Sequence, residues 1–115
     1  THSKISGEFE KSTSEFADLP YQKAITLFHI CQEALSNTAR HSNATRAKVK
    51  LWGENGRVYL EVIDNGKGFN IDATDTALGH GLSNMQRRTR KVGGEVRIDS
   101  QPLQGTSVLA WVPST

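Results

Sequence analysis

The sequence predicts an α+β fold in which helices cover one face of a mixed, mostly antiparallel sheet. Three observations support this two-layer α/β sandwich. A long amphipathic helical pattern follows a short strand pattern, an Asn-Gly pair joins two alternating strand patterns, and a second helical pattern precedes two closing strands. Helices placed between antiparallel hairpins are typical of such sandwiches. A doubly wound parallel sheet would need single strands alternating with helices, and the chain does not have that order.

The first helix is predicted from Tyr21 to Arg40. It follows a strand predicted at residues 5–10 (ISGEFE) and a polar loop at residues 12–18, and Pro20 stands near its first turn. Apolar side chains recur along this helix at spacings of three and four residues. We therefore expect one buried stripe, composed of Ala24, Phe28, Cys31, Leu35 and Ala39.

The later elements are predicted from the positions of glycine and from the alternation of apolar and polar residues. Residues 47–52 and 58–63 alternate and are joined by Asn55-Gly56, which is a strong hairpin signal. Residues 70–80 are small and polar without a period, which predicts a mobile loop. The remaining predicted elements are a helix at 81–92 ended by Gly93-Gly94, and two closing strands at 95–100 and 105–112.

Composition restricts the class of protein. The chain has 115 residues, 36% of them hydrophobic and 23% charged, which is typical of one globular domain with its own core. The net charge of +2 is too small to indicate nucleic-acid binding by itself. A single cysteine excludes a disulfide within the chain. No apolar run approaches the roughly 18 residues needed to cross a bilayer. The first residue is not methionine, so we expect a piece of a longer protein.

Two glycine-rich segments are candidates for ligand binding. Asp64-x-Gly66-x-Gly68 places a carboxylate at a strand end, where it can accept a hydrogen bond from an exocyclic amine while the glycines allow close approach. Gly79-His80-Gly81-Leu82 precedes the second helix, and backbone N–H groups at such a helix start can bind an anion. Neither segment matches a phosphate-binding Walker loop or a dinucleotide-binding fingerprint. Each segment alone is more often an ordinary turn.

The first helix carries a polar row near its C-terminal end. Glu33 and Asn37 are one turn apart, and an Asn oxygen beside a carboxylate can orient Mg²⁺. Arg40 and His41 can contact phosphate oxygens. On the helix alone, a solvated face with an arginine favoured by the helix dipole is the simpler interpretation. In the last strand, Thr106 offers a hydroxyl or is only a strand-forming residue.

The motifs QEALSNTARHS, DNGKGF, GHGLSNMQRR, KVGGEVRI and GTSV occur in this order along the chain. Over about residues 19–112, this series resembles the ATP-binding catalytic domain of a bacterial sensor histidine kinase, in the GHKL ATPase superfamily. It is most similar to the nitrate-sensor and desaturase-thermosensor class. The resemblance implies the Bergerat ATP-binding fold and one domain over residues 1–115, with an N-terminal strand and loop at 1–18 and an ATP lid at 69–80.

The resemblance also implies a role for each site residue. Asn37 corresponds to the Mg²⁺ ligand, and Glu33 to a catalytic or water-activating position one turn earlier. Arg40 and His41 stand near the phosphates. Asp64 corresponds to the residue that binds the adenine amino group, with Thr106 supporting it through water. The residues that shape the adenine wall and the lid are Gly66, Gly68, Phe69, Gly79, His80, Gly81 and Leu82.

As a histidine kinase, the chain would transfer the γ-phosphoryl group of ATP to a histidine on a separate helical dimerisation domain, for relay to a response regulator. None of His2, His29, His41 and His80 stands in an acceptor-like context. The lid is shorter than in many histidine kinases, so its mode of closure is open. We expect a monomeric isolated domain and a cytoplasmic location, including that of the cytoplasmic part of a membrane-anchored sensor.

Three other functions stay open at this point. One is an ATPase or an anti-sigma-type serine kinase on the same fold, and another is a degenerate regulator that binds nucleotide and transfers nothing. A nucleic-acid module would use the basic run from Arg87 to Lys91. That run has no interleaved aromatic residues of the kind that stack on bases, so a solvated helix face is favoured.

Overall fold

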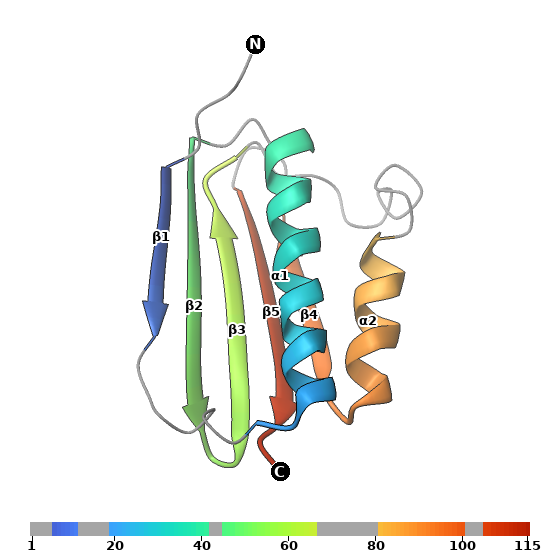
Figure 1. Ribbon diagram of the computed structural model, residues 1–115. Coiled ribbons are helices and arrows are strands. Elements are labelled where there is room, and N and C mark those ends of the chain that lie inside the picture. The colour runs from blue at the N-terminus through green and yellow to red at the C-terminus, as the bar shows by residue number, and fades with distance from the viewer. Residues whose placement is uncertain (1–5, 12–18, 42–44, 67–80, 101–104) are drawn as a thin grey trace.

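The computed structural model describes residues 6–11, 19–41, 45–66, 81–100 and 105–115. It contains the elements β1 (Ser6–Lys11), α1 (Tyr21–His41), β2 (Arg46–Glu54), β3 (Arg57–Asp64), α2 (Gly81–Lys91), β4 (Glu95–Ser100) and β5 (Thr106–Pro113) (Figure 1). Each corresponds to a predicted element, with bounds that differ by at most two residues. No helix in these ranges is long and apolar enough to cross a bilayer.

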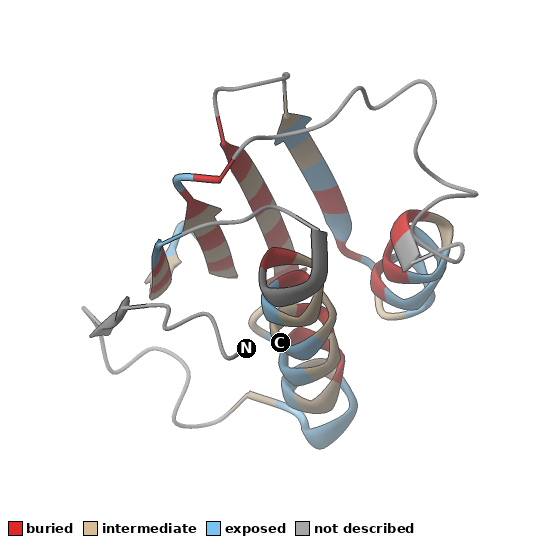
Figure 2. Cartoon of the chain, turned by 90° about the horizontal axis from the view of Figure 1, so that it is seen from above, coloured by how far each residue is buried: buried red, intermediate tan, exposed pale blue. Residues whose placement is uncertain are grey.

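The five strands form one sheet in the order β1-β2-β3-β5-β4. Only β1 and β2 are parallel, and the other neighbouring pairs are antiparallel. Both helices lie on the same face of the sheet (Figures 1 and 2). This confirms the predicted two-layer sandwich with a mixed, mostly antiparallel sheet.

The core lies between the helices and the sheet. In β3 and β5 every second side chain is buried, because successive side chains of a strand point to opposite faces. α1 packs mainly on β3, β5 and α2, and α2 packs mainly on α1 and β4. The central buried side chains are Leu27, Ile30, Val58, Leu60, Val62, Met85, Val96, Val108, Ala110 and Val112.

The turn between β2 and β3 has the geometry that its sequence predicts. Asn55 and Gly56 have φ angles of 53° and 75°. A two-residue type I′ turn requires positive φ at both central positions, which Asn-Gly adopts readily. The hairpin register that follows pairs Ala47 with Asp64 at its far end.

The predicted buried stripe on α1 is wrong. Ala24 is exposed, Phe28 and Leu35 are 55% and 38% exposed, Cys31 is half-buried, and the side chain of Ala39 lies outside the described part. Burial also raises the pKa of the Cys31 thiol. The helix instead buries the neighbouring row Leu27, Ile30, Ala34 and Thr38.

A hydroxyl in a helix explains this difference. Thr38 can enter the buried row because its Oγ1 hydrogen-bonds the Ala34 carbonyl oxygen at 3.1 Å. The hydrophobic pattern counted this threonine as polar and so favoured the adjacent row. Part of the rejected stripe, Ala24, Phe28 and Cys31, lines an apolar groove against β2 and β3.

Candidate functional site

Four of the predicted site residues meet at one edge of the described part of the fold. The C-terminal end of α1, the end of β3 and the start of α2 lie at this edge (Figure 1). Asn37, Asp64, Leu82 and Thr106 line one pocket there, together with apolar side chains that include Met85 and Ile98. The enclosed volume is about 10 Å³, roughly room for one water molecule. These residues therefore line one small pocket, which is the candidate site.

Asp64 is a buried carboxylate held by neutral donors. It occupies an inward position at the end of β3 and is 8% exposed. The Thr38 hydroxyl lies 2.9 Å from its Oδ2, and the Gly66 N–H donates to its Oδ1 at 2.8 Å. Within the described residues, no lysine, arginine or histidine forms an ion pair with it. Since each carboxylate oxygen can accept more than one hydrogen bond, Asp64 can still accept from a ligand.

Asn65 fixes the turn that places Asp64. Its Oδ1 accepts from the backbone N–H groups of Thr45 and Arg46 at 3.0 and 2.8 Å, and its Nδ2 donates to Thr45 Oγ1 at 3.0 Å. The turn after β3 is thereby tied to the start of β2. Asp64 thus lines the pocket, while the Asn65 side chain hydrogen-bonds backbone groups and fixes the turn.

Thr106 lies directly opposite Asp64 in the pairing of β3 with β5, and it is buried. Its Oγ1 is 2.9 Å from Ser100 Oγ on β4, and Ser100 also donates to the Gly105 carbonyl oxygen at 3.2 Å. Gly105 has φ 81°, and a Cβ there would stand 2.3 Å from the Asp64 carbonyl oxygen. Only glycine allows this approach of β5 to β3. Support of Asp64 by Thr106 through water stays a prediction.

Asn37 presents an oxygen without a partner. Its side-chain Oδ1 is buried and makes no hydrogen bond within the described residues. A buried acceptor left unpaired costs about 1–3 kcal/mol. No group of three or more His, Cys, Asp or Glu residues in the described ranges could hold a metal ion by itself. Mg²⁺ accepts a single protein oxygen when ligand oxygens and waters complete its shell, so Asn37 Oδ1 fits that ion.

Of the other predicted site residues, some lie within the described part of the chain and some lie outside it. Glu33 is half-buried on α1, one turn before Asn37. Leu82 is buried in the pocket wall, and Gly81 is the first residue of α2, whose first turn carries no acidic side chain. The backbone of Arg40 and His41 ends α1, and their side chains lie outside the described part. Gly68, Phe69, Gly79 and His80 also lie outside it.

The sequence reasoning missed Thr38 as a site residue. Thr38 continues the buried row of Ile30 and Ala34 at a spacing of four residues, so its hydroxyl had to find a partner in the interior. A polar residue in a helical core row, opposite a strand-ending carboxylate, was the available signal. Asn65 and Ser100 carried no comparable signal, because only strand pairing identifies their partners.

The contact of Thr38 with Asp64 leads to a testable expectation. Thr38→Val keeps the shape but removes one of the two donors to a buried carboxylate, so we expect unfolding to become easier by about 1–3 kcal/mol. Urea unfolding measures this change. Thr26→Val is the matched control, because among the described residues the Thr26 hydroxyl hydrogen-bonds the Gln22 carbonyl oxygen alone, at 2.7 Å. Equal losses in both variants would show that the Asp64 contact contributes nothing.

Comparison with known proteins places the chain in a family. Residues 22–115 match the sequence profile described as histidine kinase-, DNA gyrase B-, and HSP90-like ATPase. The sensor protein VraS of Staphylococcus aureus (strain COL) is 40% identical over 105 residues, which are 90% of this chain and 30% of VraS. VraS of Staphylococcus epidermidis (strain ATCC 12228 / FDA PCI 1200) gives the same values. The chain thus spans about 30% of the length of these relatives.

Solved structures share the fold. The histidine kinase domain of the blue-light activated histidine kinase from Erythrobacter litoralis EL346 superposes with a TM-score of 0.72 at 22% identity, over 96% of this chain and 52% of that chain. A second structure of this kinase, of which 35% is covered, gives a TM-score of 0.74 at the same identity. The profile match, the 40% identity to VraS and this common fold agree. The chain belongs to the family of histidine kinase-, DNA gyrase B- and HSP90-like ATPases.

Proposed function

We propose that this chain is the ATP-binding catalytic domain of a two-component sensor histidine kinase. It would transfer the γ-phosphoryl group of ATP to a histidine on a separate helical dimerisation domain, and a response regulator would receive that group next. The observation that carries the proposal is the buried Asp64 carboxylate, held by Thr38 and Gly66 and still able to accept from a ligand. Family membership and the similarity to the sensor VraS support it.

Adenine recognition would centre on Asp64. Its free acceptor capacity suits an exocyclic amine, which donates hydrogen bonds, and does not suit the carbonyl of a guanine-type base. Leu82 and Met85 line the pocket beside Asp64, and their apolar side chains would lie next to the base once it is bound. Gly66 and Gly68 would shape the adjacent wall, and Phe69 would lie at the start of the lid.

The phosphates would lie between the C-terminal end of α1 and the N-terminal end of α2. Asn37 would hold Mg²⁺ through its Oδ1 atom. When bound, Mg²⁺ would neutralise negative charge on the phosphates. Arg40, His41 and His80 would add positive charge or donors, and the backbone N–H groups from Gly79 to Gly81 would meet phosphate oxygens. Catalysis of this kind depends on positioning and on charge stabilisation more than on covalent chemistry of the protein.

Glu33 has the least settled role. It would either accept the proton of the acceptor imidazole or only orient Asn37 and a water molecule. General-base catalysis typically contributes about 10²- to 10⁴-fold to a rate. We therefore expect Glu33→Gln to lower phosphoryl transfer by about that range with ATP affinity unchanged, if Glu33 is the base.

The test mixes the chain with its own helical dimerisation domain and γ-labelled ATP. The proposal predicts acid-labile phosphohistidine on that domain, reduced in the Glu33→Gln variant. Bound ATP without any label transfer would indicate a degenerate regulator. Rapid ATP hydrolysis, or an acid-stable phosphoserine on a partner, would indicate the ATPase or the serine kinase instead.

The narrower assignments are also part of this proposal. The chain would belong to the nitrate-sensor and desaturase-thermosensor class, with an N-terminal strand and loop at residues 1–18 and a short ATP lid at residues 69–80. It would work in the cytoplasm, and the isolated domain would be monomeric. The similarity to the sensor protein VraS supports the assignment to sensor histidine kinases.

A further inference from the structure

A second groove lies between the helices, away from the nucleotide pocket. It runs between the N-terminal half of α1 and the length of α2 and has a volume of about 460 Å³. Arg87, Arg88 and Lys91 line it from α2 and His29 lines it from α1, and no carboxylate of the described residues lines it. The proposed phosphotransfer function uses none of these residues.

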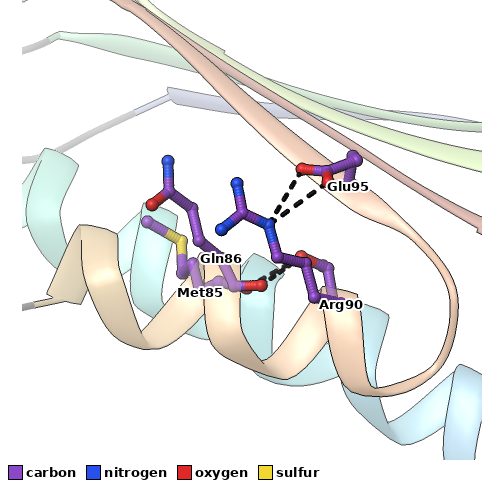
Figure 3. Close-up of polar contacts among 5 residues, drawn as sticks. Met85, Gln86, Arg90 and Glu95 are labelled. Atoms are coloured by element: carbon purple, nitrogen blue, oxygen red, sulfur yellow. Dashed lines mark hydrogen bonds and ion pairs between the residues drawn. The ribbon is translucent and has the colours of Figure 1, made fainter.

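The cations in this groove are not neutralised. Arg87, Arg88 and Lys91 are exposed, and within the described residues none of them has a carboxylate at ion-pair distance. Arg90, the remaining cation of α2, lies on the side of β4, where its Nε is 3.2 Å from Glu95 Oε1 (Figure 3). Like charges within one helical turn repel, so an anionic partner would stabilise this face.

The groove is lined by one face of each helix. The lining residues of α1 stand at 22, 25, 26 and 29, and those of α2 stand at 84, 87, 88 and 91. Both sets have the spacing of one helical face, so two parallel ridges border the groove. Ile25 and Val92 are half-buried and give it apolar contacts. A third helix placed between two others satisfies this geometry.

We propose that this groove docks an acidic amphipathic helix of a partner protein. Its carboxylates would meet Arg87, Arg88 and Lys91, while its apolar side chains would rest on Ile25 and Val92. A nucleic acid fits less well, because the part of the chain that the structure describes contributes no Phe, Tyr or Trp to the groove that could stack on a base. A membrane also fits less well, because the exposed large apolar side chains Tyr21, Phe28 and Leu35 lie outside the lining.

The probe is a fluorescent 18-residue helical peptide of Glu, Ala and Leu that contains no lysine. We expect saturable binding by anisotropy, weakened about tenfold or more when Arg87, Arg88 and Lys91 are all changed to Gln. The matched control changes Lys50, Arg57 and Arg97 to Gln, which removes the same charge from the strands and should leave binding unchanged. ATP affinity of both triple variants shows that each is folded. Carbodiimide should join the peptide to Lys91 in preference to Lys50.

Three outcomes would overturn the proposal. The first is equal affinity of the wild type and the Arg87, Arg88 and Lys91 triple variant. The second is equal binding of a proline-containing peptide with the same charge, because then helix geometry plays no part. The third is tighter binding of single-stranded DNA or phosphatidylserine vesicles that the same three substitutions abolish. That result would assign the groove to a nucleic acid or to a membrane.

Discussion

Asp64→Asn should bind ATP about 10- to 150-fold more weakly than the wild type. A hydrogen bond to a charged, buried group contributes about 1.5–3 kcal/mol, which corresponds to that range. The substitution keeps the size of the side chain but replaces one acceptor oxygen by an amide group that donates. The exocyclic amine of adenine then faces a donor instead of an acceptor. Titration of a fluorescent ATP analogue measures the loss.

Base selectivity makes this expectation sharper. The wild type should prefer ATP to inosine triphosphate, whose base carries a carbonyl in place of the amine, and Asp64→Asn should reduce or invert that preference. Asp99→Asn is the matched control, because Asp99 is exposed on β4 and pairs with Arg97 at 3.2 Å. An unchanged ATP affinity in a folded Asp64→Asn variant would remove the central observation behind the proposed function.

Asn37→Ala should make the domain more stable and less able to use Mg²⁺. The substitution removes a buried oxygen that has no partner, which relieves a cost of about 1–3 kcal/mol. It also removes the protein oxygen proposed to hold the metal. We expect a higher midpoint of thermal unfolding together with an ATP affinity that no longer rises when Mg²⁺ is added.

Helix propensity has to be separated from this effect, because alanine favours helices over asparagine by a few tenths of a kcal/mol at exposed positions. Asn84→Ala on α2 provides the control, since Asn84 is exposed. It should raise stability only by that smaller amount and leave the Mg²⁺ response intact. A destabilised Asn37→Ala variant would mean that this side chain supports the fold rather than the ligand.

The order and bounds of the elements could be predicted because local chemistry decides them. Asn55-Gly56 determines a turn with two positive φ angles, Gly93-Gly94 follows the end of α2, and alternation along β3 and β5 places every second side chain inside. The candidate site was found by a different route. Each motif was ambiguous alone, and only their order along the chain pointed to Asn37, Asp64 and Thr106.

The buried face of α1 could not be predicted in the same way. Two adjacent rows of side chains on the helix are both apolar enough to pack on the sheet. Which row is buried depends on how far the helix is rotated about its own axis. The row that ends in Thr38 is the buried one, because the Thr38 hydroxyl hydrogen-bonds Asp64 and the Ala34 carbonyl oxygen in the interior. A pattern that scores each residue by hydrophobicity does not register such a pairing.

The sequence by itself determined the fold class, the elements and the residue types that carry the chemistry, since these follow from backbone preferences and from motif order. Only the tertiary structure decided which groups act on one another. It pairs Thr38 with Asp64 and lets the Asn65 side chain hydrogen-bond the backbone of Thr45 and Arg46. Among the described residues, Asn37 Oδ1 has no hydrogen-bond partner, and Arg87, Arg88 and Lys91 of α2 line a groove beside α1 without a carboxylate at ion-pair distance. The physical reason is that hydrogen bonds and charges depend on distances of a few ångströms between residues far apart in the chain, and strand register and helix rotation fix those distances.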